Sequence, residues 1–302
     1  MSKIHCYKES GIKRLKAGDM SGAIKLFQKH IEQYSDDIEA FEILGDTYVA
    51  SDKRKPAIEA YTDALAIDPK HTTISLKLSR ALLAGVDYIQ ALTAIHQQVK
   101  PLRYIEIGVC KGVSFSLAHS DIIAIGIDPE PQIDFSLLPE KHHVISKTSD
   151  DYFASGRIQK DFGGQPFDMA FLDGMHLFEY ALRDFIHLEK YSHSDSIVFI
   201  HDLYPLNKNT AKRERFADFW SGDVWKLALC LKEYRSDLTY SLLPCPPTGL
   251  GVVTGLDAES TILQDNYDAI LEKYIDMSYD ILEENKQKKL SLTDTDHPLL
   301  NV

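Results

Sequence analysis

Five mostly apolar runs follow one another after Pro101, at residues 103–109, 122–128, 143–146, 167–173 and 196–202. Segments with helical spacing lie between them, as in LFEYALRDFIHLEKY at 177–191. Continuous apolar runs of this length are typical of parallel strands that are covered on both faces. The pattern therefore predicts an open α/β sheet that binds its ligand at the carboxyl ends of the strands.

The remaining third of the chain after these runs has a different pattern. Two more apolar runs, 239–244 and 249–255, are joined by the short segment CPPT. Antiparallel strands need only a short loop, so these runs predict a terminal hairpin that brings the mostly parallel sheet to seven strands. Residues 258–287 predict an acidic helix, and the last fifteen residues predict a loose tail.

Residues 4–100 instead repeat with a period of 34 residues. A small residue in each unit lets two helices approach closely, and a bulky residue one turn later fills the groove between them. The positions that show the period are Ala23, Ala57 and Ala91; Phe27, Tyr61 and Ile95; and Gly11 and Gly45. The best unit, from Ile38 to about Thr72, resembles the tetratricopeptide repeat at most of its signature positions. These are Phe41, Leu44, Gly45, Tyr48, Ala57, Tyr61, Ala64 and Pro69.

The resemblance to tetratricopeptide repeats implies a concave groove between stacked helical hairpins. Such grooves often bind a peptide or a protein partner. With only two or three units, the same helices could equally serve as a structural cap or as a surface for self-association. The sequence leaves both interpretations open.

Composition narrows the class of protein. Hydrophobic residues make up 44% of the chain, which is enough for a sizeable core. No run of 18 or more apolar residues occurs, so we expect no membrane span, and the N-terminus MSKIHCYKESGIKRLK lacks the apolar core of a signal peptide. Four cysteines without CxxC spacing favour free thiols in the cytoplasm over disulfides or zinc: Cys6, Cys110, Cys230 and Cys245. Residues 1–100 are roughly neutral, so the net charge of −12 arises after residue 100, which argues against a nucleic-acid partner.

Candidate chemistry begins where the first predicted strand ends. Glu106, Gly108 and Gly112 form a glycine turn, at which the backbone can approach a ligand and the next helix can offer its N-terminal amides. A dinucleotide fingerprint GxGxxG would need glycine at Cys110 and Val113, so that match fails.

The tips of the second and third strands carry further polar residues. Asp128 ends the second strand, 22 residues after Glu106, where a carboxylate can accept hydrogen bonds from the two hydroxyls of a ribose. A helix or turn cap is the alternative for Asp128. Ser149 and Asp150 follow the third strand, and a helix N-cap explains them almost as well as a ligand contact does.

The fourth and fifth strands end in Asp173 and Asp202, which should meet at one edge of the sheet. Two carboxylates there could hold a divalent cation, which would orient a substrate hydroxyl and lower its pKa. His176 and His201 lie beside them, and either could be the base that removes the hydroxyl proton. One histidine alone would favour a structural role, but the two Asp–His pairs at adjacent strand tips favour a site.

The segment that follows Asp202 is rich in basic and aromatic residues. Lys212, Arg213 and Arg215 could bind an anionic group of a substrate, or they could form a solvated helix face. The aromatic residues could form the floor of an acceptor pocket, although core packing is expected for at least two of them. They are Phe216, Phe219, Trp220 and Trp225.

The region from about 103 to 255 resembles class I S-adenosylmethionine-dependent methyltransferases, in the branch of macrocin O-methyltransferase-like and catechol O-methyltransferase-like enzymes. The matching segments are EIGVCKG, GIDPEP, FLDGMHLFEYALRDF, VFIHDLYP, GDVWK and PPTGLGVV. The terminal hairpin also distinguishes this version of the sheet from the dehydrogenase version. The resemblance implies methyl transfer to an oxygen, often with magnesium.

By this resemblance, one set of residues binds the cofactor and a second set binds the metal and the substrate. The cofactor residues are Glu106, Gly108, Gly112, Asp128, Ser149, Asp150 and Asp173, with Ser149 and Asp150 at the adenine. Asp173 and Asp202 take the two carboxylate metal positions, and His176 takes the position of the catalytic histidine. The chain departs from the family at Leu203, where catechol-type enzymes have Asn, and at His201, where macrocin-type enzymes have an acidic residue. His201 is thus the candidate third ligand, and it suits manganese, iron or zinc better than magnesium.

We therefore expect an α-helical repeat domain at 1–100, a Rossmann-like methyltransferase domain at 101–257 and a C-terminal helix and tail at 258–302. The expected activity is O-methylation of a sugar, a glycan or another small molecule, with S-adenosylmethionine and possible help from Mg²⁺ or Mn²⁺. The alternative is an interaction protein in which the repeats bind a partner or a second copy and the α/β domain is degenerate. Cephalosporin-hydroxylase-like proteins share the fold, although no facial-triad spacing is evident in this chain.

Overall fold

The computed structural model describes the backbone of residues 4–300 and the side chains of residues 7–300. The chain divides into two compact units. The helical unit comprises residues 1–84 together with 216–219, and the sheet unit comprises residues 85–215 and 220–302. Each unit is described in turn below.

The helical unit contains five helices in the described part of residues 1–84: α1 (Ile4–Lys16), α2 (Met20–Gln33), α3 (Ile38–Ala50), α4 (Arg54–Ile67) and α5 (Thr72–Leu82). Helices α1 and α2 pack as one hairpin and α3 and α4 as a second. The 34-residue period has a physical basis in these hairpins. A methyl group added at Gly11 would lie 2.8 Å from the Phe27 ring, and one added at Gly45 would lie 2.3 Å from the Tyr61 ring. Each glycine thus lets an aromatic ring of the partner helix pack against the backbone.

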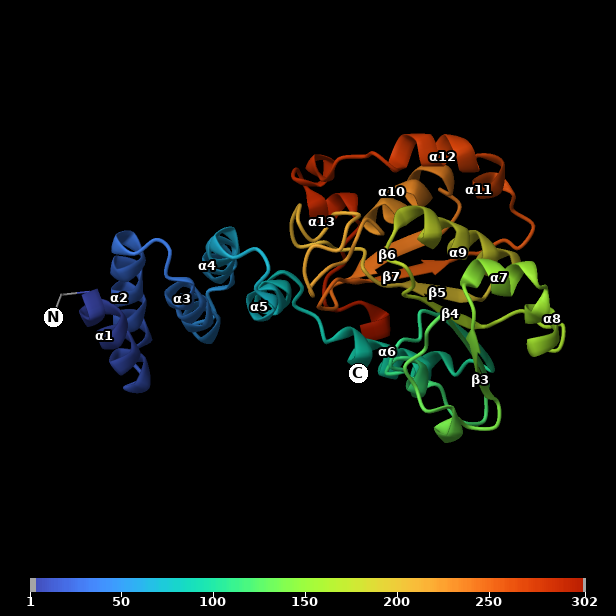
Figure 1. Cartoon of the computed structure of the whole chain (residues 1–302), viewed down its shortest axis with the longest axis horizontal. Helices are drawn as coiled ribbons and strands as arrows, with labels where there is room; N and C mark the ends of the chain where they lie inside the picture. Colours follow the sequence, from blue (N-terminus) through green and yellow to red (C-terminus); the bar gives the residue numbers. More distant parts are fainter. Residues whose placement is uncertain (1–3, 301–302) are drawn as a thin grey trace. The chain divides into compact units, whose positions relative to one another are not determined.

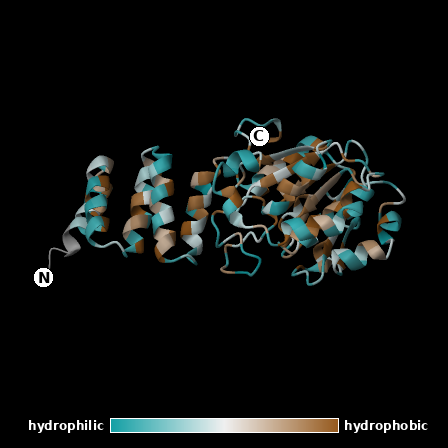
Figure 2. Ribbon diagram, turned by 90° about the horizontal axis from the view of Figure 1, so that it is seen from above, coloured by the Kyte–Doolittle hydropathy of each residue, from teal (hydrophilic) through white to brown (hydrophobic). Residues whose placement is uncertain are grey.

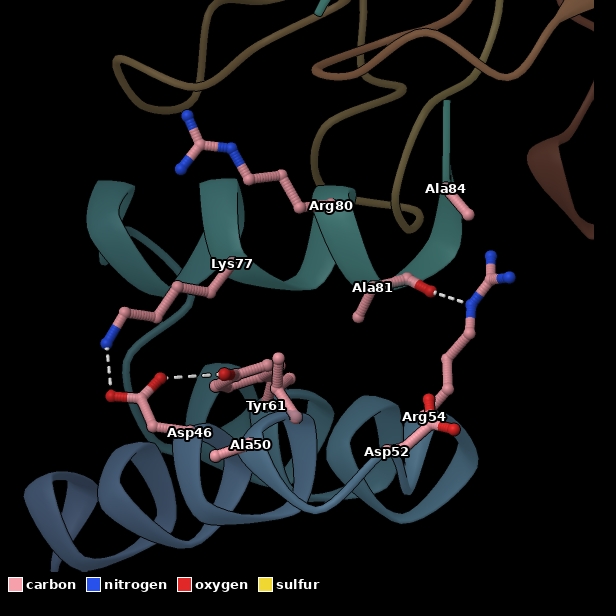
Figure 3. Close-up of a pocket in the computed structure, with 10 residues that line it drawn as sticks. Asp46, Ala50, Asp52, Arg54, Tyr61, Lys77, Arg80, Ala81 and Ala84 are labelled. Carbon is pink, nitrogen blue, oxygen red and sulfur yellow. Dashed lines mark hydrogen bonds and ion pairs between the residues drawn. The ribbon is translucent and has the colours of Figure 1, made fainter. Parts of the chain in front are cut away.

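A hollow of about 520 Å³ lies between α3, α4 and α5 of the helical unit (Figure 3). The Tyr61 hydroxyl donates to Asp46 at 2.7 Å, and the Lys77 ammonium donates to the same carboxylate at 2.7 Å. Small side chains of Ala50, Ala81 and Ala84 leave the remaining space open. This hollow lies on the part of the chain for which the sequence predicts a partner-binding groove.

The sheet unit has seven strands: β1 (Arg103–Ile107), β2 (Ile123–Asp128), β3 (His142–Ser146), β4 (Met169–Leu172), β5 (Ile197–Ile200), β6 (Thr239–Leu243) and β7 (Leu250–Thr254). Their order in the sheet is β3-β2-β1-β4-β5-β7-β6. The first five strands are parallel, and β7 is antiparallel to both of its neighbours. The expected fold is confirmed: helices precede a seven-stranded, mostly parallel Rossmann-like sheet with a terminal antiparallel hairpin.

Helices cover both faces of this sheet (Figure 1). On one face lie α9 (Phe178–Lys190) and α10 (Trp225–Tyr234), which contact each other. On the other lies α6 (Tyr88–Val99), whose Ala91, Leu92 and Ile95 are fully buried in the same apolar cluster as strand residues such as Tyr104 and Phe171. Figure 2 shows the apolar strands enclosed between these layers. The sequence assigned residues 1–100 to the repeats, whereas α6 groups with the sheet.

One predicted helix is missing. The sequence predicted a helix directly after the glycine turn at the end of β1, but the structure has only the short 3₁₀ turn η1 (Phe115–Leu117) before β2 begins. A further 3₁₀ turn, η2 (Phe135–Leu137), connects β2 to β3. The face of the sheet that a helix after β1 would cover is occupied by α6 instead, because α6 brings its own apolar stripe.

The predictions for the C-terminal region were also wrong in part. In place of one acidic helix at 258–287 there are four short elements, α11 (Ile262–Asp265), α12 (Tyr267–Tyr274), η3 (Tyr279–Leu282) and α13 (Lys286–Lys289). The tail is not loose up to residue 300. Leu242 exchanges backbone hydrogen bonds with Ser291 and Thr293, and Leu300 in η4 (Pro298–Leu300) is buried against α6. The apolar residues of this C-terminal segment are spaced irregularly and pack within short elements. A helical periodicity therefore does not describe them.

Within residues 4–300, no helix combines the length and the apolar character needed to cross a bilayer. Cys110 is exposed, and Cys230 and Cys245 are buried as free thiols. The side chain of Cys6 lies outside the described residues.

Candidate active site

A pocket of about 780 Å³ opens at the carboxyl ends of β1, β2 and β4 in the sheet unit. This volume is in the range of sites for small ligands and cofactors. Its lining comes from the loops that follow these strands, from the residues around the start of α7 (Ser149–Ala154), from α9, and from Tyr88 at the start of α6. Gly108, Asp128, Ser149, Asp150, Asp173 and His176 all line it, as the sequence places them at strand tips.

The turn after β1 brings two strand tips into direct backbone contact. Gly108 has a φ angle of +93°, which favours glycine over every other residue. A Cβ atom at this position would lie 1.9 Å from the carbonyl oxygen of Asp173. Gly108 therefore provides both the turn and the close approach of β1 to β4, and it lines the pocket.

Asp128 at the tip of β2 fixes the next part of this turn. One carboxylate oxygen accepts a hydrogen bond from the backbone N–H of Cys110 at 2.7 Å, and the other accepts from the N–H of Glu130 at 2.8 Å. Cys110 itself has a φ angle of +47°. A carboxylate oxygen has two lone pairs, so Asp128 can accept a ligand hydroxyl in addition to these amides.

Two of the predicted cofactor residues do not line the pocket. Glu106 is fully buried and accepts hydrogen bonds from the hydroxyls of Tyr104 at 2.6 Å and Ser114 at 2.7 Å. Burial raises the pKa of Glu106 to about 8, although these hydrogen bonds lower it. Gly112 has a φ angle of +73° and packs beside Ile133. Both residues support the turn from below.

The predicted adenine contacts have different surroundings from each other. Thr148 caps α7 through its hydroxyl, so the N-cap is the residue before Ser149. Both oxygens of Asp150 are bound by the guanidinium of Arg183, at 3.0 and 2.8 Å. Ser149 hydrogen-bonds to Asp184 of α9, a buried carboxyl whose pKa burial raises to about 7.

The tips of β4 and β5 bring four predicted residues into one cluster. His201 Nδ1 lies 3.2 Å from Asp173 Oδ1 and 3.6 Å from Asp202 Oδ2. His176 Nδ1 lies 2.8 Å from Asp202 Oδ2, and its Nε2 lies 3.7 Å from Asp173 Oδ1. Asp173, His201 and Asp202 each offer one ligand atom, and these atoms all lie within 4.8 Å of one another.

The two carboxylates and the two imidazoles of this cluster shift one another's pKa values. Burial lowers the pKa of His176, but Asp202 and Asp173 outweigh it and bring the pKa to about 9. Burial also lowers the pKa of His201, and the same two carboxylates raise it well above its usual value. Burial raises the pKa of Asp202, whereas the two histidines lower it strongly overall. The carboxylates thus need positive charge beside them, which can come from protons on the imidazoles or from a metal ion.

Hydrogen-bond geometry in the cluster fits metal ligands. His176 Nδ1 and Asp202 Oδ2 are both buried, yet neither has a hydrogen-bond partner among the described residues despite their separation of 2.8 Å. Two donor atoms that lie this close without pointing at each other are arranged like neighbouring ligands of one ion. His201 Nε2 lies 3.2 Å from the Thr248 hydroxyl, and such a contact orients the other ring nitrogen of a metal ligand.

A second loop fixes the position of His176, which has a φ angle of +58°. A Cβ atom on Gly222 would lie 1.8 Å from the His176 carbonyl oxygen, and that oxygen accepts a hydrogen bond from the N–H of Asp223 at 3.2 Å. The Trp220 ring stacks on the His176 imidazole, with centroids 5.3 Å apart and planes at 7°. These contacts hold the imidazole against Asp202.

The basic and aromatic residues after Asp202 differ in their roles. The segment does not form the solvated helix face considered from the sequence, because residues 203–224 contain no helix. Arg213 binds Glu179 at 2.6 Å and Asp223 at 2.8 Å, so it supports the loop that carries Gly222. Phe219 and Trp225 are buried, in agreement with core packing, and Trp220 is the one of the four that stacks on a histidine of the cluster.

A comparison with protein families gives one match. Residues 105–203 match a family model described as a methyltransferase domain. The match supports a class I S-adenosylmethionine-dependent methyltransferase. It runs from β1 to the residue after Asp202, so it contains Gly108, Asp128, Asp173, His176, His201 and Asp202 of the pocket and the cluster beside it.

Three residues that contact the pocket or the cluster lie outside the matched segment, and sequence reasoning missed two of them. Tyr88 lines the pocket, and its ring packs on the His201 ring with centroids 4.3 Å apart and planes tilted by 30°, but its helix was assigned to the repeats. Thr248 approaches His201 from the β6–β7 connection. Trp220 was among the aromatic candidates. Tyr88 lies 85 residues before Asp173 in the sequence, and no local motif marks it as a site residue. The sequence around it shows only that a helix starts at Asp87.

Proposed function

We propose that this chain is an S-adenosylmethionine-dependent O-methyltransferase that acts on a hydroxyl of a sugar, a glycan or another small molecule with the help of a divalent cation. The observation that carries the proposal is the pocket in which the Gly108 turn and Asp128 lie beside the cluster of Asp173, His176, His201 and Asp202. A cofactor region and an acceptor region thus share one opening at the edge of the sheet.

The residues of the pocket fit S-adenosylmethionine, which supplies the methyl group. Gly108 lines the pocket, and its lack of a side chain lets the β1 turn approach the backbone of Asp173. Asp128 accepts hydroxyl hydrogen bonds from a ribose, and the two backbone amides that it already binds keep it in place. Glu106 would act through Ser114 and the turn rather than by touching the cofactor.

The cluster at the tips of β4 and β5 also fits a divalent cation, which would lower the pKa of an acceptor hydroxyl. Asp173, His201 and Asp202 would hold it, and the unpaired Asp202 Oδ2 supports this assignment. Imidazole ligands favour manganese, iron or zinc over magnesium. His176, which also lines the open pocket, is the better candidate for the base, since His201 is buried beneath it.

Titration calorimetry with S-adenosylhomocysteine tests the proposal. We expect micromolar binding by the wild-type chain, and a loss of at least tenfold in Asp128→Ala because a hydrogen-bonding partner of the ribose is removed. Asp195→Ala, an exposed carboxylate at the opposite end of β5, is the matched control and should bind as the wild type does. A wild-type chain that failed to bind S-adenosylhomocysteine with or without Mn²⁺ would refute the proposed function.

Tyr88 should orient the acceptor. Its hydroxyl has no hydrogen-bond partner in the described part of the chain, its ring is fixed on His201, and it lines the pocket. Burial and the charge of Asp173 raise the pKa of Tyr88, so the hydroxyl is a donor. We expect Tyr88→Phe to raise the KM for the acceptor by about tenfold, the effect of one lost hydrogen bond, with unchanged affinity for S-adenosylhomocysteine.

The measurement is methyl transfer from labelled S-adenosylmethionine to a panel of monosaccharides and catechols, followed by kinetics on the acceptor that is methylated. Tyr234→Phe, on the far end of α10, serves as the control. An unchanged KM in Tyr88→Phe would remove Tyr88 from acceptor binding. The same panel shows whether the chain methylates a sugar or a catechol.

The alternative, a repeat-mediated interaction protein with a degenerate domain, is less well supported. A degenerate site would not need to keep two carboxylates and two imidazoles in contact. The helical unit can still serve as a docking part, and the hollow between α3, α4 and α5 supports a protein partner or a second copy as part of the proposal. The glycine–aromatic contacts that repeat along the helical unit support tetratricopeptide repeats as part of the proposal. The free thiols support a cytoplasmic location as a further part of it.

A further inference from the structure

The sheet unit has a second cavity, of about 550 Å³, at the opposite end of the strands from the candidate active site. Leu102 and Ile122 line it, and they lie directly before β1 and β2. We call it the amino-end cavity. Among the described residues, none lines both this cavity and the pocket at the carboxyl ends of the strands. The two cavities are therefore separate, and the volume of this one is also in the range of small-molecule sites.

The amino-end cavity lies where α6 and the short turn η1 cover the sheet in place of a longer helix after β1. These two elements contact each other, and the cavity is lined by Thr93, His96 and Gln97 of α6 and by Leu117 of η1. Leu117 and Ile122 also pack against the apolar core cluster, so part of the cavity wall is continuous with the core. Leu102 is 66% exposed and adds apolar surface that faces water.

One polar group in this wall has no partner within the chain. His96 is 9% exposed, and its ring packs edge-on against the Tyr104 ring with centroids 4.8 Å apart. Its Nε2 atom has no hydrogen-bond partner among the described residues. Burial lowers the pKa of His96 to about 4, so the ring is uncharged at neutral pH. An unpaired buried nitrogen is costly, so a ligand that supplies a partner for it is favoured.

The charges around the amino-end cavity favour an anionic ligand. No acidic residue lines the cavity, although the chain has 45 acidic residues and a net charge of −12. Lys100 lines it, and the ammonium group of Lys100 has no ion-pair partner in the described part of the chain. His119 also lines it, and its Nδ1 atom lies 3.5 Å from Asp121, an exposed carboxylate outside the lining. Apolar walls beside an unpaired cation suit an apolar molecule that carries one carboxylate.

We propose that the amino-end cavity binds an amphipathic carboxylate, whose apolar body packs on Leu117 and Ile122 and whose anionic end binds Lys100 and His96. This inference goes beyond the proposed function, because it concerns the other end of the sheet. Burial of the apolar body supplies most of the affinity. The anionic end adds less, since Lys100 is exposed, but it decides which charge the ligand carries.

Calorimetry on the full chain tests the charge preference with three probes of equal chain length: octanoate, octan-1-ol and octylammonium. We expect saturable binding of octanoate, about tenfold weaker binding of octan-1-ol, and no measurable binding of octylammonium, because the carboxylate alone can accept from both polar groups. Equal binding of the three probes would overturn the assignment of an anionic ligand. Failure of octanoate to bind would overturn the site itself.

Variants of the lining locate the bound octanoate. Leu102→Glu changes an exposed residue, so it should fold normally, and its added carboxylate should weaken octanoate at least ~10-fold. His96→Phe keeps a ring against Tyr104 but removes the nitrogen, and it should weaken octanoate ~10-fold. Lys160→Gln, at an exposed lysine outside the lining, is the control and should bind as the wild type does.

Thermal unfolding of each variant separates loss of binding from loss of the fold. Octanoate affinity equal to that of the wild type in both Leu102→Glu and His96→Phe would place the probe elsewhere and overturn the proposal. Sedimentation gives the remaining outcome. A dimer that Leu102→Glu dissociates, in a chain that does not bind octanoate, would assign this surface to a second copy instead.

Discussion

Asp202→Asn should abolish binding of the divalent cation while leaving the cofactor region intact. Asp202 is 3% exposed, and its Oδ2 atom lies 2.8 Å from His176 and 3.6 Å from His201. Replacing one oxygen by an amide removes the negative charge from the centre of the cluster. Changes in residues that merely support metal ligands cost ~10–100-fold in affinity, so loss of a ligand should cost at least about 100-fold. Turnover should fall with cation binding.

The choice of asparagine keeps the backbone unchanged. Asp202 has a φ angle of +62°, a conformation that asparagine tolerates better than alanine does. Titration of Mn²⁺ in the presence of S-adenosylhomocysteine measures the effect, with Asp195→Asn as the control at the other end of β5. Mn²⁺ affinity equal to that of the wild type would exclude Asp202 as a ligand. Loss of S-adenosylhomocysteine binding at the same time would point to a folding defect rather than to the metal.

Gly108→Ala should abolish cofactor binding. The new methyl group would lie 1.9 Å from the carbonyl oxygen of Asp173 and 2.5 Å from its carbonyl carbon. Both atoms belong to the backbone, so either the β1 turn or the tip of β4 must move. Both of these loops line the pocket. We expect S-adenosylhomocysteine affinity to fall at least ~100-fold, which corresponds to about 3 kcal/mol.

Gly163→Ala separates this clash from backbone strain. Gly163 has a φ angle of +60°, but no heavy atom lies within 4 Å of the position of an added Cβ. It should lose ~1–2 kcal/mol of stability at most and bind S-adenosylhomocysteine normally. Calorimetry for binding and thermal unfolding for stability give the two readouts. Binding by Gly108→Ala within threefold of the wild type would exclude the Gly108 turn as the floor of a cofactor site.

Local patterns were sufficient for the sheet. The bounds of all seven strands agree with the apolar runs to within about two residues. The agreement is expected, because strands that are covered on both faces must be apolar along their length. The connections were harder. The 34-residue period extends through Ala91 and Ile95, so α6 resembled a third repeat, but the side chains that continue the period are buried against the sheet. A small–bulky spacing fits either a partner helix or a sheet, and sequence alone does not distinguish them.

The site was predictable where its residues lie at strand tips. Asp128, Asp173, His176, His201 and Asp202 follow directly from the parallel topology. Residues contributed by other elements were not, because their relation to the site depends on tertiary packing: Tyr88 from α6 and Thr248 from the terminal hairpin. Glu106 was placed at the cofactor by its position in a motif, although its side chain turns into the core beside Tyr104.

Because α6 packs on the sheet, it determines where the chain can be truncated to produce the sheet unit without the helical unit. A fragment that starts at residue 101 would lack Leu92 and Ile95 and would leave apolar strand residues open to water. It would also lack Tyr88, whose N–H donates to Pro246, and the N–H of Gly85, which donates to Pro244. The smallest fragment that keeps the sheet unit whole therefore begins near Gly85, and truncations should start there.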